Sequence, residues 1–208
     1  MITSIQFEML DDLYQYYNKE LFEGKLPDCM IITSRRKGAH GTFIFENWKN
    51  KKNKKDEKYI HEISLNPDSL DRKDEEWQST LVHEMIHLWQ YVYGKPSRAG
   101  YHNKEWAQKM EGIGLMPTNT GKEGGKKTGQ GVTHYIIPDG AFIKAFKKLK
   151  EKELNCIPTG AALNIKKPAA ANARSKTKYT CECGNNVWGK PNLIITCNAC
   201  QKIFLEAE

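Results

Sequence analysis

The chain has 208 residues, which suits one domain of catalytic size with a small appendage but not two full domains. Hydrophobic residues make up 39% and aromatic residues 10%, a composition that excludes a disordered or fibrous protein. The longest uncharged run, residues 154–165, is too short to span a bilayer, and the N-terminus lacks the apolar run of a secretory signal. We therefore expect a cytoplasmic protein that does not associate with membranes.

The net charge of +7 is unevenly distributed along the chain. Residues 1–117 hold 17 basic and 18 acidic side chains, whereas residues 118–208 hold 15 basic and 7 acidic ones. This pattern is expected for a neutral domain joined to a basic tail that binds a polyanion. A tail that only increases solubility explains the charge equally well.

The first half of the chain predicts a helix, a set of strands and a second helix. Apolar residues at steps of three and four predict a helix over residues 5–21. A second helix is predicted over residues 74–93, because Gly94 and Pro96 follow it. Three strand-like segments lie between these helices, at 29–34, 41–46 and 59–65, with a lysine-rich loop at 48–58.

The second half predicts a short helix, a loop and a basic helix. The short helix begins near His102 and ends at Gly112 and Gly114, and residues 116–140, rich in Gly and Thr, read as a long loop. An amphipathic helix is predicted over 141–154. We therefore divide the chain into residues 1–154 with a core at 5–117, a linker at 155–178 biased towards Ala, Lys and Pro, and a compact module at 179–208.

The second predicted helix carries the motif H-E-x-x-H, formed by His83, Glu84 and His87. Positions i and i+4 project from the same face of a helix, so both imidazoles can bind one ion. Glu84 lies beside that ion, where it can take a proton from a metal-bound water. The surrounding residues are mostly apolar, and buried histidines there would be costly without a partner. We interpret the motif as a zinc site; a core helix with incidental histidines is the alternative.

A catalytic zinc needs a third protein ligand and an open position for water. A metzincin would place its third His six residues after the second, where this chain has Tyr93, so that family is excluded. His102 and Glu105 remain as candidates, about one turn apart at the start of the next helix, and spacing alone allows either. The other three histidines lie outside any ligand spacing and are expected to be hydrogen-bonded or exposed: His40, His61 and His134.

Several blocks of the chain resemble the SprT-like zinc metallopeptidases, the domain of the Spartan proteases. They are LYQYYNKELFEGKLPDCMIIT, AHGTFIFE, YIHEISLN, LVHEMIHLWQ and YHNKEWAQKMEGIGL, in consistent order from about residue 9 to 116. In that family the third ligand is a His opening an H-x-x-E-[FW] block, which here is His102 of HNKEW. The segment 116–178 departs from the family because it is longer than a minimal SprT domain needs.

The resemblance implies an α+β fold. It consists of a small zincin-like metallopeptidase domain, with helices on a short sheet, followed by a linker and a small β zinc ribbon. The implied reaction is peptide hydrolysis, in which zinc lowers the pKa of its water and Glu84 carries the proton to the leaving amine. A sheet edge beside the cleft could hold the substrate as an added strand. Tyr101 and His134 are candidates for stabilising the oxyanion, unless the zinc itself suffices.

A second metal site, formed by cysteines, is predicted near the C-terminus, where four of the six cysteines fall within the last 28 residues. Four thiolates around one Zn²⁺ form a structural site with no position for water, and a module this small depends on the metal to fold. A redox dithiol pair is the alternative. The four cysteines are Cys181, Cys183, Cys197 and Cys200. A tiny core is expected from Tyr179, Val187, Trp188, Leu193, Ile194 and Phe204.

These observations predict a zinc metalloendopeptidase with one catalytic and one structural zinc, acting on a protein substrate. Basic residues lead into the ribbon, and Trp188 could stack on a base, so we expect DNA as a partner. Spartan-type proteases cut proteins crosslinked to DNA, and the resemblance therefore implies a DNA-repair protease, at the nucleoid if the source is bacterial or phage. The predicted nucleic-acid contacts are Lys166, Lys167, Arg174, Lys176, Lys178 and Trp188.

Two other functions are compatible with the sequence. One is a nucleic-acid-binding zinc-ribbon protein whose zincin domain is structural and non-proteolytic; the intact Glu84 argues against it, because a structural zinc needs no base. The other is a peptidase that acts without nucleic acid. The oligomeric state is not indicated by any pattern in the chain.

Overall fold

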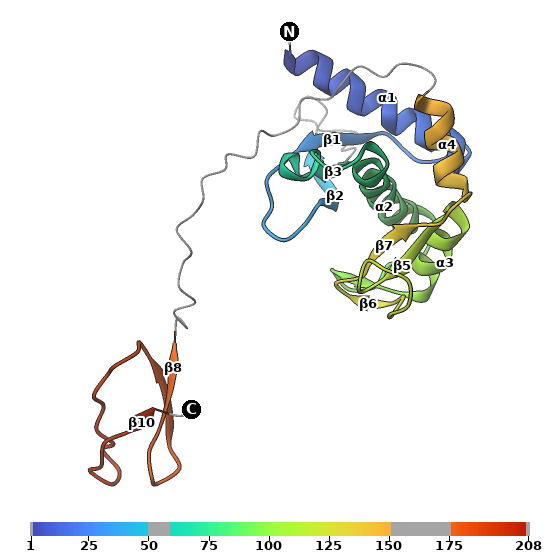
Figure 1. Cartoon of the computed structure of the whole chain (residues 1–208). Coiled ribbons are helices and arrows are strands. Elements are labelled where there is room, and N and C mark those ends of the chain that lie inside the picture. Colours follow the sequence, from blue (N-terminus) through green and yellow to red (C-terminus); the bar gives the residue numbers. More distant parts are fainter. Residues whose placement is uncertain (1, 50–58, 151–175, 207–208) are drawn as a thin grey trace. The chain divides into compact units, whose positions relative to one another are not determined.

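The structure, a computed structural model, describes residues 2–49, 59–150 and 176–206. The chain divides into two compact units, Met1–Ala162 and Leu163–Glu208. Helices and small sheets together make up the N-terminal unit, as the predicted α+β class requires (Figure 1). Among the described helices, none combines the length and the apolar character needed to cross a lipid bilayer.

Helix α1 (Ile2–Phe22) and helix α4 (Ala141–Lys150) pack against each other although they lie far apart in the sequence (Figure 1). The Tyr17 ring stacks on Phe142 with centroids 5.7 Å apart, and Tyr16 Oη donates to the carbonyl of Ala145 at 2.8 Å. Phe146 is buried as well. The apolar face predicted for the basic helix therefore packs on the domain; its predicted continuation to residue 154 lies outside the described residues.

Three strands form the main sheet: β1 (Cys29–Thr33), β2 (Gly41–Lys49) and β3 (Tyr59–Leu65). Their order is β1-β3-β2, with β3 parallel to β1 and antiparallel to β2. Strand β2 is thus an edge strand, and it packs beside helix α2. A 3₁₀ turn, η1 (Pro67–Ser69), follows β3. The lysine-rich loop is outside the described residues from position 50 onward.

Helix α2 (Asp74–Tyr93) has the predicted bounds. The acidic side chains of its first turn interact favourably with the partial positive charge at the helix N-terminus. The helix ends at Gly94. The side chains around the H-E-x-x-H motif are buried, including Leu81, Met85 and Ile86 at 0% exposure. The helix therefore runs through the core, between the main sheet and the strands of the second half (Figure 1).

Helix α3 (Lys104–Ile113) begins later than predicted. The side chain of Asn103 caps it by accepting from the Trp106 backbone N–H at 3.0 Å, and Gly114 ends it with a left-handed φ of 93°. His102 therefore lies before the helix, in the short strand β4 (Tyr101–His102). His102 and Glu105 therefore flank the start of α3, close to the predicted arrangement, with the cap residue Asn103 between them.

The predicted long loop at residues 116–140 is also wrong in part, since the segment contains strands. They are β5 (Leu115–Thr118), β6 (Gly129–Gln130) and β7 (Thr133–Ile136). Strand β5 pairs with β7, and β6 pairs with β4. Strands of two to four residues are too short for a hydrophobic period, so only their pairing with distant segments reveals them.

The C-terminal unit contains an antiparallel sheet of order β10-β8-β9. Its strands are β8 (Thr177–Thr180), β9 (Asn186–Gly189) and β10 (Leu205–Glu206). Strand β8 begins inside the predicted linker, so Thr177 and Lys178 belong to this unit. Residues 151–175, which hold the rest of that linker and Cys156, lie outside the described residues.

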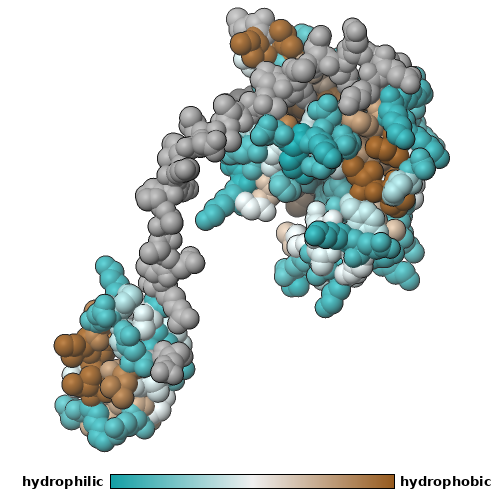
Figure 2. Space-filling model, in the orientation of Figure 1, coloured by the Kyte–Doolittle hydropathy of each residue, from teal (hydrophilic) through white to brown (hydrophobic). Residues whose placement is uncertain are grey.

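The core of this unit is smaller than predicted. Tyr179 and Phe204 are buried, together with two cysteines, and Val187 packs against them. Trp188, Leu193 and Ile194 are exposed, so their predicted place in the core is wrong. Successive side chains of a strand point to opposite faces, and Val187 therefore turns inward while Trp188 turns outward. Hydrophobic side chains are accordingly visible on the surface of this unit (Figure 2).

Candidate metal-dependent active site

Three histidines from two elements meet beside helix α2. His83 and His87 lie one turn apart on the helix, with ring centroids separated by 5.1 Å. His102 from β4 reaches the same place, 5.5 Å from the His83 ring and 4.9 Å from the His87 ring. One nitrogen from each ring lies within 4.8 Å of the others. This arrangement could hold one metal ion with three imidazole ligands and leave a further position open.

A polar clamp between α2 and the start of α3 brings His102 to this place. The buried Gln90 donates through Nε2 to Asn103 Oδ1 at 2.7 Å and to Glu105 Oε2 at 2.8 Å. Glu105 also accepts from the backbone N–H of Lys95 at 2.7 Å. These hydrogen bonds lower the pKa of Glu105 and hold its carboxylate on the clamp. The alternative third ligand is therefore used to join two helices, and it is not part of the histidine group.

The Trp106 ring packs against the rings of all three histidines. Its ring centroid lies 4.9 Å from that of His83, 5.3 Å from His87 and 4.2 Å from His102, and the side chain is fully buried. Its indole N–H is the one buried side-chain polar atom in the described part of the chain that has no hydrogen-bond partner. A large, rigid side chain in contact with three rings restricts the rotamers that each ring can adopt.

A chain of hydrogen bonds determines the tautomer of His83. Ser79 Oγ donates to the carbonyl of Glu76 at 2.8 Å, which leaves its oxygen to accept from His134 Nε2 at 2.8 Å. The other ring nitrogen of neutral His134 then has no proton and accepts from His83 Nδ1 at 3.1 Å. His83 therefore carries its proton on Nδ1, and its Nε2 lone pair is free to bind a metal.

His102 is oriented by a backbone group in the same way. Its Nδ1 lies 3.3 Å from the carbonyl oxygen of Gly129, and a carbonyl can only accept, so Nδ1 carries the proton. Gly129 belongs to β6 and His134 to β7, both within the segment predicted as a loop. Sequence reasoning missed this supporting layer, because neither residue has a ligand spacing to the H-E-x-x-H motif.

Burial keeps the histidines neutral. Desolvation, reinforced by the neighbouring histidines, lowers the pKa of His83 well below its usual range and that of His87 to about 3. Burial also lowers the pKa of His102 and takes that of His134 to about 4. Neutral imidazole is the form that binds a metal, so the three histidines can act as metal ligands at neutral pH without first losing a proton.

Glu84 lies beside the histidines and is buried against strand β2. A Cβ atom on Gly41 would lie only 2.9 Å from Glu84 Oε1, so the strand can approach this closely only because residue 41 is a glycine. Burial raises the pKa of Glu84 to about 8, opposed by a hydrogen bond from the Phe43 backbone and by the charge of Arg36. A cation bound by the adjacent histidines would favour the carboxylate form.

The four cysteines of the C-terminal unit also come together. Cys181 Sγ lies 3.2 Å from Cys200 Sγ, and Cys183 Sγ lies 3.6 Å from Cys197 Sγ, distances too long for disulfide bonds. Backbone N–H groups of Cys200 and Ala199 lower the pKa of Cys197 to about 6, which favours its thiolate. All four sulfur atoms lie within 4.8 Å of one another, as four ligands of one ion would.

The remaining predicted site residues are not members of these two ligand groups. Tyr101 is partly exposed beside the Arg98 guanidinium, while both ring nitrogens of His134 are used in hydrogen bonds. His40 and His61 are hydrogen-bonded to Ser69 and to the backbone of Glu46, as expected for histidines outside the site. Lys176, Lys178 and Trp188 lie on the C-terminal unit. Lys166, Lys167 and Arg174 lie outside the described residues.

The SprT-like family model matches residues 10–124, more than half of the chain. This match confirms the resemblance and includes the H-E-x-x-H motif and His102 but not His134. The chain has no significant match among curated proteins or among solved structures.

Proposed function

The chain belongs to the SprT-like family, and from this premise we propose that it is a zinc-dependent metalloendopeptidase with a zincin-like active site. The convergence of His83, His87 and His102 is the observation that carries the proposal. Three neutral imidazoles in a buried site, with a carboxylate next to them, suit a catalytic rather than a structural zinc. A structural site would offer a fourth protein ligand, and Glu105 is held elsewhere.

The reaction is hydrolysis of a peptide bond. A zinc ion held by the three histidines would act as a Lewis acid towards the scissile carbonyl and lower the pKa of the attacking water. Glu84 accepts a proton from that water and donates it to the leaving amine. Strand β2, at the edge of its sheet and in contact with Glu84, offers backbone groups on which an extended substrate can pair as an added strand.

The four cysteines of the C-terminal unit are proposed to hold a second, structural zinc. Their sulfur atoms surround one point, and the side chain of Asn185 donates to Cys183 Sγ at 3.3 Å. Such outer hydrogen bonds stabilise the negative charge of thiolate ligands. A closed set of four thiolates leaves no position for water and performs no chemistry.

DNA is the proposed partner of the C-terminal half, and DNA-bound or crosslinked proteins are the proposed substrates. The support is the excess of basic residues after position 117, together with Trp188, which is 63% exposed and available for stacking on a base. A protease carried to DNA by this unit would act on proteins that are bound there.

The test is cleavage of a DNA-bound protein by the full chain, comparing the wild type with Glu84→Gln. The Gln side chain has the same shape but cannot carry the proton, so the rate should fall by about 10²-fold or more, while zinc content stays unchanged. Glu105→Gln serves as the matched control and should retain activity. Equal cleavage by wild type and Glu84→Gln would refute the proposed mechanism.

The same assay separates the role of DNA from the chemistry. Trp188→Ala should weaken binding to single-stranded DNA and lower DNA-dependent cleavage, whereas Ile194→Ala, at another exposed hydrophobic residue of the same unit, should leave both unchanged. Cleavage at the same rate with and without DNA would favour a peptidase that acts independently of nucleic acid. DNA binding without any cleavage would favour a non-proteolytic zinc-ribbon protein.

A further inference from the structure

A cavity of about 280 Å³ opens beside the histidine group, and the proposed chemistry leaves it without a role. Residues from three parts of the chain line it, among them His40, Arg72, Thr80 and His134. The volume is ample for one side chain of a bound substrate. His134, which also contacts His83, forms the wall between this cavity and the histidine group.

The cavity lies on the Glu84 side of the site. Thr80 precedes Glu84 by four residues on helix α2, so both side chains lie on one face of the helix. A Cβ atom on Gly41 would lie 2.9 Å both from Thr80 Cγ2 and from Glu84 Oε1, which shows that both side chains meet the start of β2. Because Glu84 delivers its proton to the leaving amine, the substrate residue that carries this amine lies next to the cavity.

Arg72 supplies the fixed charge of the cavity. Its guanidinium donates through Nε to the Ser69 carbonyl at 2.9 Å and through Nη2 to Thr80 Oγ1 at 2.9 Å. These two bonds orient the group and leave further N–H donors of the guanidinium unused. Among the ion pairs between described residues, none involves Arg72. Glu76, the acidic residue of the lining, is exposed, and its charge partly offsets the burial that lowers the pKa of Arg72.

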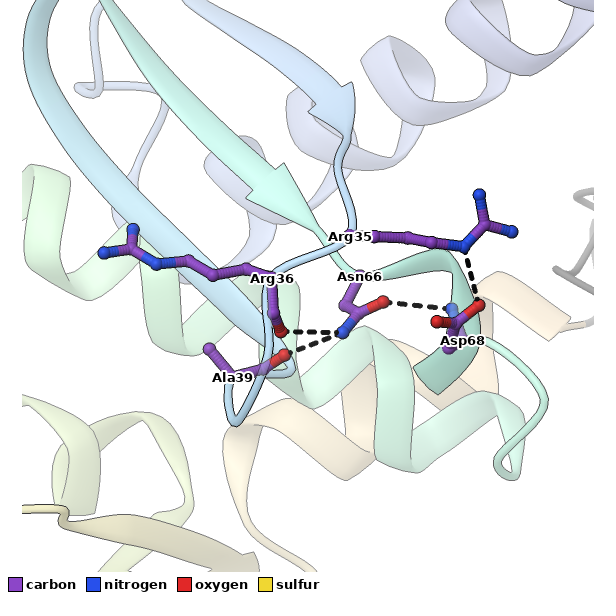
Figure 3. A network of polar contacts seen from close by, with 5 residues as sticks. All are labelled: Arg35, Arg36, Ala39, Asn66 and Asp68. Carbon is purple, nitrogen blue, oxygen red and sulfur yellow. Dashed lines mark hydrogen bonds and ion pairs between the residues drawn. The ribbon is translucent and has the colours of Figure 1, made fainter. Parts of the chain in front are cut away.

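The wall opposite helix α2 is held rigidly. Asn66 Nδ2 donates to the carbonyls of Arg36 and Ala39 at 3.1 and 3.0 Å (Figure 3). The backbone N–H of Asn66 donates to the carbonyl of His40 at 2.8 Å. The ring of His40 lies 2.7 Å from Ser69 Oγ. The loop between β1 and β2 is therefore held both at His40 and at the residues before it, and this side of the cavity has a preformed shape.

We propose that this cavity binds an acidic side chain of the substrate, on the residue that follows the scissile bond, through a paired hydrogen bond to the Arg72 guanidinium. An oriented guanidinium that has N–H groups left over, and that forms no hydrogen bond to a carboxylate among the described residues, is the group that best recognises a planar oxyanion. The inference rests on the proposed peptidase function, because it places the cavity relative to the leaving amine. It assigns Arg72 as a specificity-determining residue that does not take part in the chemistry.

The test uses the full zinc-loaded chain and a library of peptides prepared from a proteome. Mass spectrometry of the new N-termini reads the residue that follows each cut. Wild type should enrich Asp and Glu at this position several-fold, Arg72→Met should abolish the enrichment, and Arg72→Glu should favour Lys and Arg instead. Arg35→Met, the same substitution at an exposed arginine paired with Asp68, is the control and should keep the acidic preference.

Two peptides that differ only in having Glu or Gln after the scissile bond measure the size of the preference for an acidic residue. Wild type should prefer Glu by about tenfold in kcat/KM, as expected for one charge-assisted contact, and Arg72→Met should lose this preference while still cutting the Gln peptide. A phosphoserine peptide cut faster than the Glu peptide would overturn the assignment to a carboxylate. Cleavage without an acidic preference would overturn the inference alone, whereas no cleavage of any peptide or DNA-bound protein would overturn the proposed function itself.

Discussion

The two candidate metal sites of this chain differ in how much protein surrounds them. The histidine group lies against a core that runs from α1 to α4, and Trp106 alone touches all three of its rings. The cysteine group has Tyr179 and Phe204 as its buried apolar neighbours, and two of the cysteines complete that core. The first site is thus built on an existing fold, whereas in the second the ligands are a large part of what holds the fold together.

This difference is what the two proposed roles, catalytic and structural, require. An open coordination position is useful only if the remaining ligands keep their places without the metal's help, and a core with oriented histidines provides that rigidity. A closed set of four thiolates needs no such scaffold, because metal binding and folding are one event. The comparison of the two sites predicts the outcomes of four experiments, given below from the largest expected effect to the smallest, and each experiment could contradict it.

Metal removal should produce the largest difference between the units. A strong chelator should abolish amide-exchange protection across residues 177–206, because binding of a structural zinc supplies about 10–16 kcal/mol of folding free energy. Protection in α1 and α2 should remain. Cys197→Ser should reproduce the loss without chelator, whereas Cys29→Ser should not. Survival of β8 and β9 in the chelated protein would show that this unit folds on its own core.

Removing the third ligand should empty one site and leave the other filled. His102→Ala should lower zinc content from two to one per chain and abolish cleavage, while the thermal unfolding of the large unit stays cooperative. Glu105→Ala should lose the bonds to Gln90 and Lys95 but retain both zincs, because Gln90 still holds Asn103 next to His102. The zinc content of both variants shows which residue is the third ligand. Loss of one zinc from Glu105→Ala, with both retained in His102→Ala, would make Glu105 the ligand.

The hydrogen-bond chain behind His83 should matter less than a ligand but still measurably. His134→Ala removes the acceptor of the His83 Nδ1 proton, and loss of such an outer partner typically weakens metal binding 10–100-fold. A competition titration with a chromophoric chelator measures the change. His61→Ala, a histidine on β3 bonded to the Glu46 backbone, is the control and should bind zinc normally. Unchanged affinity in His134→Ala would mean that Trp106 and the helix alone orient His83.

Side-chain hydrogen bonds in the C-terminal unit should have the smallest effect. Tyr179 Oη contacts the Lys190 carbonyl at 2.6 Å and the Leu193 backbone N–H at 3.0 Å. Tyr179→Phe should lower the stability of the zinc-loaded unit by about 0.5–1.5 kcal/mol in a denaturant titration, far less than metal removal. Tyr16→Phe, which loses one bond to Ala145, provides the matched measurement in the large unit. Unfolding of the zinc-loaded Tyr179→Phe protein would contradict the dominance of the metal.

The parts predicted well share a local physical cause. The bounds of α2 follow from a hydrophobic period and a terminating glycine, and the pairing of His83 with His87 follows from the helical repeat. The four cysteines lie close in sequence, so their meeting needs only short loops. By contrast, β5, β6 and β7 were predicted as a loop, because each is shorter than the patterns that identify a strand. The prediction of Trp188 as a core residue is wrong because Val187 takes the inward position on β9 and leaves Trp188 exposed.

The sequence by itself determined the chemistry that is available: a pair of imidazoles with a neighbouring carboxylate on one helix, a second set of four thiolates, and a basic C-terminal half. The tertiary structure alone decided how these groups are used. It brings His102, which spacing left open and the family resemblance named, to the pair, and it holds Glu105 elsewhere. It also orients His83 through His134 and places Arg72 in a cavity beside Glu84. The physical reason is that spacing along a helix sets contacts within one turn, whereas contacts between distant segments depend on how the whole chain packs.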